Sequence, residues 1–129
     1  MVTFQAVPVN ITIIQVYAPT TTDSENEYDR FYEDLQQAIN RVPRRLALFV
    51  MGDFNAKLGE CSNQLPTLGQ YGLGERNEAV DTLYSFCVEN NLTITKTLFN
   101  HPKRKRYTRI APDGKTRNQI DYIMVHNRW

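Results

Sequence analysis

The apolar residues of this chain alternate in several short runs, a pattern that predicts β-strands. Residues 10–17 are rich in β-branched side chains and alternate well enough for a strand that ends at Ala18. Residues 46–51 are wholly apolar and bounded by Arg45 and Gly52, as expected for a buried strand. Further short strands are predicted over 92–95, 103–110 and 118–125, the last two joined by the turn-forming sequence Pro112-Asp113-Gly114.

Two other segments carry apolar residues at intervals of three and four, the spacing of an amphipathic helix. The first follows Ser24-Glu25-Asn26-Glu27, which matches a capping box, and ends near Pro43. The second is expected to begin with Asn77 as its N-cap and to end at Asn90-Asn91, residues that tolerate a left-handed turn. Its inner face would carry Val80, Leu83 and Cys87. Strands and helices in this order predict one layered α/β domain.

Composition is typical of a single globular domain. The chain has 129 residues, of which 41% are hydrophobic and 22% charged. The longest apolar run, residues 46–51, is far shorter than a membrane span, and the N-terminus lacks the pattern of a signal peptide. We therefore expect an intracellular protein with no membrane partner. Cys61 and Cys87 match no zinc-binding spacing and are expected to be buried or idle thiols.

Charge is distributed unevenly, although the net charge is only +1. Residues 1–100 carry seven basic and twelve acidic side chains, whereas residues 101–129 carry eight basic and two acidic ones. The densest basic run is Lys103-Arg104-Lys105-Arg106, and Arg109 follows shortly after it. Such a segment can pair with the phosphates of DNA; the alternative is a solvated hairpin end.

The main candidate for chemistry is Gly52-Asp53-Phe54-Asn55, which directly follows the predicted buried strand. Period-two geometry would point the side chains of Asp53 and Asn55 to the same side. A carboxylate can accept a proton from a water nucleophile or bind a cation, and a carboxamide can hydrogen-bond to a phosphoryl oxygen and to that water. Because Gly-Asp-x-Asn is also common in turns, a surface turn is the alternative.

Two further residues could join this site. Tyr17 stands at the end of the first strand, where its hydroxyl could donate to a phosphate; alternatively, it is a half-buried tyrosine with a satisfied hydroxyl. Asp121 lies within an apolar strand, where an ionised carboxylate needs a partner. That partner could be a histidine that the carboxylate orients, or simply the cation of an ordinary salt bridge.

Three ordered motifs carry a resemblance to a known superfamily. Val16-Tyr17-Ala18-Pro19, Gly52-Asp53-Phe54-Asn55 and Gln119-Ile120-Asp121-Tyr122-Ile123 resemble the endonuclease/exonuclease/phosphatase superfamily. Residues 72–77 and 112–121 are similar, more particularly, to the endonuclease of RTE-type non-LTR retrotransposons and to the related craniofacial development protein 2 family. The resemblance covers nearly the whole chain. It implies a four-layer α/β sandwich of the deoxyribonuclease I type, of which residues 1–129 would form the C-terminal portion.

The resemblance also implies a role for each matching position. Asp53 would help to activate the attacking water or protonate the leaving group, and Asn55 would orient that water and the phosphate. Tyr17 would contact the scissile phosphate, and Asp121 would orient a catalytic histidine. Mg²⁺ or Mn²⁺ would stabilise charge on the phosphorane and the leaving oxygen, with Asp53 and Asn55 as a weak secondary metal site.

Two residues before the second predicted helix are further candidates for DNA contact. Arg76 and Asn77 could reach the phosphate backbone together with the basic run, but a helix cap explains Asn77 equally well.

The chain departs from the superfamily pattern at both ends. The upstream Asn and metal-binding Glu would precede residue 1, and the final Ser-Asp-His motif would follow Trp129. His101 and His126 stand in other contexts and are not expected to replace that histidine, and Arg109 stands where the family usually has Trp. We therefore expect part of a nuclear DNA-nicking endonuclease, inactive as 129 residues alone. A non-catalytic nucleic-acid-binding remnant and a small-molecule phosphoesterase are the alternatives.

Overall fold

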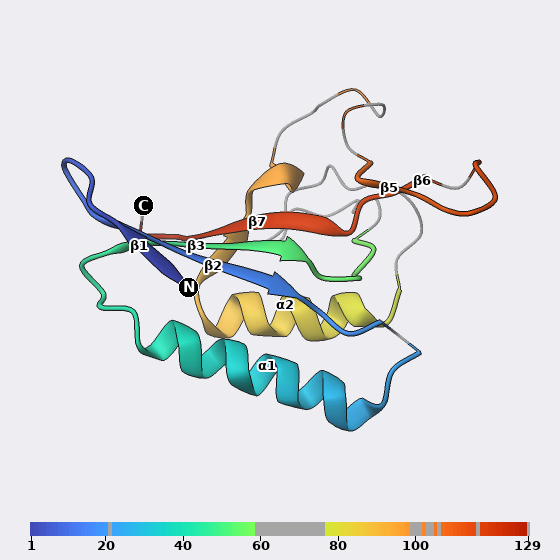
Figure 1. The fold of residues 1–129 in the computed structure, drawn as a ribbon, viewed down its shortest axis with the longest axis horizontal. Coiled ribbons are helices and arrows are strands. Elements are labelled where there is room, and N and C mark those ends of the chain that lie inside the picture. The colour runs from blue at the N-terminus through green and yellow to red at the C-terminus, as the bar shows by residue number, and fades with distance from the viewer. Residues whose placement is uncertain are drawn as a thin grey trace.

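The computed structural model describes residues 1–20, 22–58, 77–98, 102, 105, 107–115 and 117–128. Its elements, drawn in Figure 1, are β1 (Val2–Phe4), β2 (Ile11–Tyr17), α1 (Glu25–Asn40), β3 (Ala47–Asp53), α2 (Ala79–Glu89), β4 (Leu92–Ile94), the 3₁₀ turn η1 (Thr95–Thr97), β5 (Arg109–Ile110), β6 (Arg117–Asn118) and β7 (Asp121–His126). The predicted mixed α/β class is confirmed. Neither α-helix in these ranges combines the length and the hydropathy needed to cross a bilayer.

Five strands form one mixed sheet in the order β1-β2-β3-β7-β4. β2 and β3 are parallel and are connected through α1, whereas the other neighbouring strands are antiparallel. Both α-helices lie against the same face of the sheet (Figure 1). The opposite face carries no α-helix among the described residues, and we call it the open face.

Alternate residues of the central strands fill the core between the sheet and the helices. Ile14, Val50 and Met124 are register neighbours on β2, β3 and β7, and all three are buried. Leu35 of α1 and Leu83 of α2 belong to the same buried cluster. Burial of one such side chain contributes about 1.5–3 kcal/mol, so this layer is a main source of stability. The residues between them in sequence point to the open face.

Helix α1 begins with the predicted capping box. The Ser24 hydroxyl accepts a hydrogen bond of 3.3 Å from the Glu27 backbone N–H, and the Glu27 carboxylate accepts one of 3.2 Å from the Ser24 N–H. Tyr32 and Leu35 are the buried residues of the helix, which confirms its apolar face. Together the cap and the apolar face explain why a helix forms here.

Helix α2 differs from its prediction at the N-terminus. It begins at Ala79, and no side chain caps it. The side chain of Asn77 instead binds the backbone of residues 55 and 57, because that segment passes beside it and needs hydrogen-bond partners of its own. The predicted inner face is confirmed, and Asn91 has the left-handed φ of 52° expected after the helix.

The C-terminal hairpin is shorter than predicted. β5 and β6 pair as a small separate sheet around a turn in which Gly114 has a φ of 70°. The chain then changes sheets, and β7 joins the main sheet from Asp121. The Thr108 hydroxyl accepts hydrogen bonds of 3.1 Å and 3.2 Å from the Ile120 and Asp121 N–H groups, which attaches the hairpin at this point. The edge strand β1 was not predicted, because three residues are too few for a pattern.

Candidate functional site

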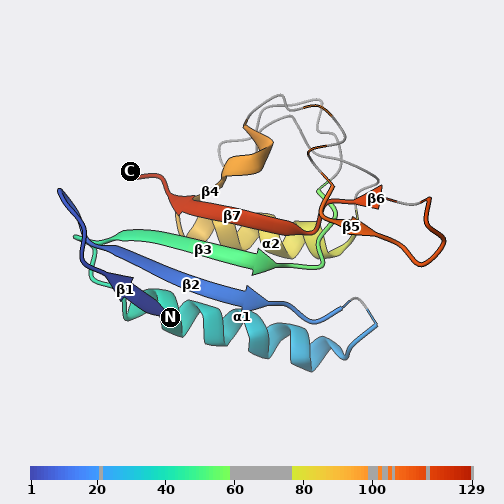
Figure 2. The same ribbon diagram turned by 45° about the horizontal axis from the view of Figure 1, so that its top comes forward.

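Three of the four predicted catalytic residues lie in one row across the sheet. Tyr17, at the end of β2, is the register neighbour of Asp53, at the end of β3. Asp53 is in turn the register neighbour of Asp121, at the start of β7. Register neighbours on adjacent strands point to the same face, so all three face the open side. We call Tyr17, Asp53 and Asp121 the polar row. It lies at the end of the sheet from which the β5–β6 hairpin extends (Figure 2).

The polar row is accessible to solvent. Tyr17 is 74% exposed, which excludes the alternative that it is a half-buried core tyrosine. Asp53 and Asp121 are half-buried. No ion pair to Asp121 is seen in the described ranges, so the salt-bridge alternative receives no support there. The row therefore presents two carboxylates and one phenol to any molecule that approaches the open face.

The backbone around Asp53 depends on two unusual residues. Gly52 has a φ of +145°, and a side chain there would collide with the backbone of Val16. Asn55 has a φ of 48°, in the left-handed region that Asn tolerates better than most residues. The Asn55 N–H donates to Asp53 Oδ1 at 2.8 Å, the pattern of an Asx turn. Regular strand alternation therefore ends at Asp53.

Asn55 is less accessible to solvent than the polar row. The side chain is buried, and its Nδ2 donates to the Ala18 carbonyl at 2.8 Å. The Ala18 N–H donates to the Asp53 carbonyl, also at 2.8 Å. Asn55 thus ties together the two strand ends that carry Tyr17 and Asp53. The strand geometry from which we expected Asp53 and Asn55 to point to the same side does not extend to Asn55, because the left-handed turn interrupts it.

Tyr122 holds the segment after Asp53, although sequence patterns assigned it no function. Its buried hydroxyl lies 2.8 Å from the Ala56 carbonyl and 2.5 Å from the Gln119 carbonyl, and accepts from the Leu58 N–H at 3.3 Å. A hydroxyl has one proton, so it donates to one carbonyl at a time. Burial raises the pKa of Tyr122, which keeps the group protonated. Alternation could have indicated this role, since the residue after an outward-facing Asp121 must face inward.

Asn77 braces the same segment. Its Oδ1 accepts from the Lys57 N–H at 2.9 Å, and its Nδ2 donates to the Asn55 carbonyl at 3.1 Å. Both ends of the carboxamide are therefore bound to backbone. The predicted contact of Asn77 with DNA would have to compete with these bonds. Arg76, predicted to act beside it, lies outside the described residues.

The surroundings of Asp53 shift its pKa in opposite directions. Burial raises the pKa of Asp53 above its ordinary value, the hydrogen bond from the Asn55 N–H lowers it, the neighbouring Asp121 raises it, and the Arg109 guanidinium lowers it. The net effect is upward. A carboxyl group of this kind exchanges protons closer to neutral pH, which suits general acid–base catalysis.

The predicted basic surface is described only in part. The positive charge of Arg109 acts on Asp53 and lowers the pKa of that carboxyl. Lys105 is exposed and lies in a turn closed by its N–H on the Pro102 carbonyl at 2.8 Å, instead of in the predicted strand. Lys103, Arg104 and Arg106 lie outside the described residues.

Lys96 is a cation near the polar row that sequence reasoning missed. It belongs to η1 and lines, together with Asp121, a pocket of about 390 Å³ on the open face. Gln15, Met51 and Ile123 line the same pocket. Lys96 and Asp121 are far apart in the chain, and only the pairing of β4 with β7 brings them together. No local sequence signal could have found this neighbour.

The described residues contain no cluster of three or more His, Cys, Asp or Glu side chains suited to a metal ion. The polar row supplies two carboxylates on adjacent strands, Asp53 and Asp121. Oxygen ligands of this type suit a hard cation such as Mg²⁺. In the predicted pair Asp53 and Asn55, the Asn55 side chain is buried and its Nδ2 is bound to the Ala18 carbonyl, which leaves only its Oδ1 as a possible ligand.

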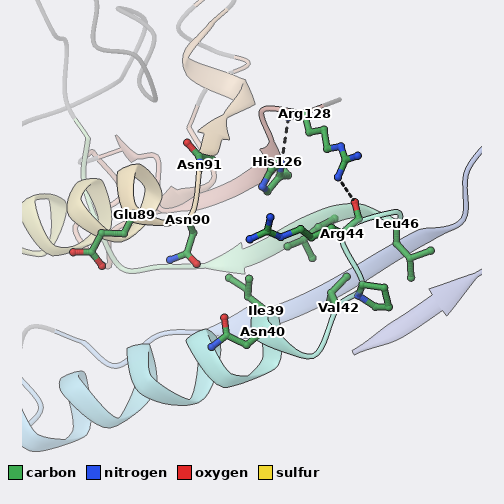
Figure 3. A pocket seen from close by; sticks show the side chains of 12 residues that line it. Ile39, Asn40, Val42, Arg44, Leu46, Glu89, Asn90, Asn91, His126 and Arg128 are labelled. Carbon is green, nitrogen blue, oxygen red and sulfur yellow. Dashed lines mark hydrogen bonds between the residues drawn. The ribbon is translucent and has the colours of Figure 1, made fainter.

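A larger pocket of about 590 Å³ lies at the opposite end of β7, beside the C-terminal ends of both helices (Figure 3). Arg44, His126 and Arg128 are among its lining residues. The Arg128 guanidinium donates to the Arg44 carbonyl at 2.9 Å, and His126 Nδ1 accepts from the Arg128 N–H at 3.2 Å. His126 and Asp121 stand at the two ends of β7, so this histidine is not the partner expected beside Asp121.

Comparison with known proteins identifies close relatives of this segment. No protein-family model matches the chain. It is 50% identical over 129 residues to Craniofacial development protein 2 of Bos taurus, an alignment that covers 99% of this chain and 22% of that protein. It is 49% identical over 127 residues to Craniofacial development protein 2 of Tragulus javanicus, covering 98% and 22%. The chain spans about a fifth of the length of these curated relatives. It is therefore homologous to one segment of proteins named Craniofacial development protein 2, as the sequence motifs led us to expect.

Proposed function

We propose that this chain is part of a metal-dependent endonuclease of the endonuclease/exonuclease/phosphatase superfamily, which nicks DNA by hydrolysing a phosphodiester. The observation that supports this is the polar row, in which Tyr17, Asp53 and Asp121 are register neighbours on three adjacent strands. Like charges directly opposite each other destabilise a sheet. Two facing carboxylates therefore favour a function that uses them. In a retrotransposon the nick would prime reverse transcription, and a DNA substrate implies a nuclear location.

Each residue of the site has a role that its position supports. Asp53, with its raised pKa, would take a proton from the attacking water or return one to the leaving oxygen. The exposed Tyr17 hydroxyl would donate to the scissile phosphate. Asp121 would orient a histidine supplied by another part of the protein. Asn55 would position Tyr17 and Asp53 by holding their strand ends together, and its Oδ1 and second amide hydrogen would remain for the water and the phosphate.

The polar row fits a divalent cation. Asp53 and Asp121 would offer carboxylate oxygens to Mg²⁺ or Mn²⁺, the ligands that such a hard cation prefers. When bound, the ion supplies stabilisation of negative charge on the phosphorane and the leaving oxygen.

The open face supports the proposal of a larger fold. Ile13, Phe49 and Ile123 alternate with core residues and are only partly buried, and Phe4 is 51% exposed. A sheet with apolar side chains on both faces is stable when both are covered. We therefore propose that a second sheet from a longer protein packs on the open face. The result would be the four-layer α/β sandwich, with residues 1–129 as its C-terminal portion.

Nicking of supercoiled plasmid tests the proposal. The 129-residue chain is assayed with Mg²⁺ beside the same residues placed within the full-length cattle relative. We expect nicking in the full-length context and far slower nicking by the chain alone, because the histidine and further metal ligands would come from elsewhere. Asp53→Asn and Asp121→Asn should each slow nicking by about 10²-fold or more, the usual contribution of an acid–base group.

A matched control separates the site from a general effect of charge. Asp34→Asn removes the same charge from an exposed position on α1 and should leave the rate unchanged. Nicking that survives both substitutions in the polar row would show that the row is not the active site. DNA binding without nicking in the full-length context would instead establish a non-catalytic nucleic-acid-binding module. Hydrolysis of phosphate monoesters alone would establish a small-molecule phosphoesterase.

A further inference from the structure

We propose that Asn77 and Tyr122 are positioning residues of the candidate active site. Together they hold residues 55–58 in the conformation on which the preceding carboxylate, Asp53, depends for its orientation. The inference rests on the proposed nuclease function and deepens it. It gives Asn77 a task other than the predicted contact with DNA, and it gives Tyr122 a part in the reaction as well as in the fold.

Residues 55–58 need hydrogen-bond partners from other parts of the chain. They belong to no helix or strand, yet Ala56 is fully buried and Leu58 is only 3% exposed. Buried backbone N–H and C=O groups that lack partners in regular secondary structure must find them elsewhere in the fold. Such bonds decide where each peptide group points, so the residues that supply them also set the path of the segment.

Asn77 makes three bonds to this segment. Its Nδ2 donates to the Asn55 carbonyl at 3.1 Å, and its Oδ1 accepts from the Lys57 N–H at 2.9 Å. Its own backbone N–H donates to the Lys57 carbonyl at 3.3 Å. Both the side chain and the backbone of Asn77 are therefore bound to the segment, although 20 positions in the sequence separate Asn77 from Lys57.

Tyr122 binds the same segment from another element, β7. Its hydroxyl lies 2.8 Å from the Ala56 carbonyl and accepts from the Leu58 N–H at 3.3 Å. Tyr122 directly follows Asp121, so this contact links the strand that carries one carboxylate of the polar row to the segment that follows the other. The tyrosine side chain is buried in the core between the sheet and the helices. A second sheet on the open face would leave this contact undisturbed.

Asn55 transmits these constraints to Asp53. Its φ of 48° lies in the left-handed region, which a residue other than glycine keeps only where its surroundings fix it. The Asn55 N–H donates to Asp53 Oδ1 at 2.8 Å, and its Nδ2 donates to the Ala18 carbonyl, also at 2.8 Å. Asn77 binds the carbonyl of the same residue. Removal of the Asn77 side chain should therefore loosen the turn that orients Asp53.

Two simpler roles fit Asn77 less well. A residue needed only to start helix α2 would cap it, but no side chain caps this helix. A contact with a DNA phosphate would have only the second amide hydrogen of Asn77, because its Oδ1 and its other amide hydrogen are bound to backbone. The bonds of Asn77 are thus directed at the segment after Asp53.

Nicking kinetics of the full-length cattle relative that carries residues 1–129 test the inference. Asn77→Ala and Tyr122→Phe should each lower kcat by about 10- to 100-fold, because a displacement of about 1 Å in an active site can cost that much. KM for the plasmid should stay within about twofold, since neither residue binds the substrate. Ser24→Ala is the matched control: it removes the cap of α1, which also destabilises the fold, and should leave kcat unchanged.

Three results would overturn the inference and leave the proposed function standing. The first is an unchanged kcat in both variants of a full-length protein that nicks. The second is a raised KM with an unchanged kcat for Asn77→Ala, which would assign this residue to DNA contact. The third is an equal loss of kcat in Ser24→Ala, because stability alone would then explain the effect. Tyr122→Phe keeps the buried ring, so it tests the inference even if Asn77→Ala does not fold.

Hydrogen exchange of the 129-residue chain separates this inference from the proposed function, because it requires no nicking activity. Asn77→Ala should speed exchange at the Asn55 N–H more than at the Val50 N–H in the middle of β3, since the turn loosens locally. Such a result for a protein that does not nick plasmid would refute the nuclease and retain the positioning of Asp53. Equal acceleration at the two amides would overturn the inference.

Discussion

Gly52→Ala tests why a glycine precedes Asp53. Gly52 lies in β3 with a φ of +145°, a conformation that residues with a Cβ rarely adopt. A Cβ at this position would stand 2.9 Å from the carbonyl carbon of Val16 on β2, and closer still to its oxygen. The obstacle is backbone held in register, so it cannot rotate away as a side chain would.

Two costs of this substitution add together. The backbone conformation itself costs about 1–3 kcal/mol. To restore ordinary contact the Val16 carbonyl oxygen must retreat by more than about 1 Å. That movement would strain the bonds between β2 and β3, including the 2.8 Å bond from the Ala18 N–H to the Asp53 carbonyl. Two such bonds are worth about 1–3 kcal/mol, so we expect a total loss of about 2–6 kcal/mol in the free energy of unfolding.

Urea unfolding followed by circular dichroism measures this loss, and Gly114→Ala is the matched control. Gly114 also has a positive φ, +70°, but a Cβ there would meet nothing within 4 Å. It should therefore cost only the conformational strain, about 1–2 kcal/mol. Equal losses for the two variants would refute the reasoning, because the collision with Val16 would then contribute nothing. A larger loss at Gly52 would link the motif to the register that brings Tyr17 beside Asp53.

Three further predictions follow from buried or perturbed groups. Asp53→Asn should raise the urea midpoint at pH 7, because the pKa of Asp53 is raised in the folded state and its ionised form therefore destabilises the fold. The stability gained by the variant should shrink as the pH falls through that pKa. A constant advantage at all pH values would contradict this. Tyr122→Phe should lower the free energy of unfolding by about 1–3 kcal/mol and speed hydrogen exchange at the Leu58 N–H. Unchanged exchange would show that the Tyr122 hydroxyl does not hold this segment. In a Cys61→Ser variant, Cys87 should not react with Ellman's reagent at pH 8 until urea unfolds the chain, because burial raises the pKa of its thiol to about 12. Rapid reaction of the folded protein would show that Cys87 is not buried.

Local patterns were sufficient wherever one stretch of chain decides its own structure. Ser24 and Glu27 form the capping box that their spacing predicts, and α1 follows it. Residues 47–53 form a strand where the apolar run 46–51 predicts one, and an Asx turn of Asp53 and Asn55 follows it. Residues 72–77 and 112–121 also indicated the relatives that comparison then identified. Periodicity, capping and turn chemistry involve neighbours within a few residues, so sequence records them directly.

Tertiary pairing decided what no local pattern contains. The register of β2, β3 and β7 placed Tyr17, Asp53 and Asp121 in one row, and a shift of a single residue would have turned one of them to the core. The same kind of pairing, of β4 with β7, brought Lys96 to Asp121. Asn77 does not cap α2 as expected, because its amide is hydrogen-bonded to the backbone of residues 55 and 57. The buried amide of Asn55 is likewise hydrogen-bonded to a distant residue, through the carbonyl of Ala18. A polar group forms hydrogen bonds with whichever partner folding brings within reach. Long-range packing decides which partner that is, so the neighbours along the chain do not reveal it.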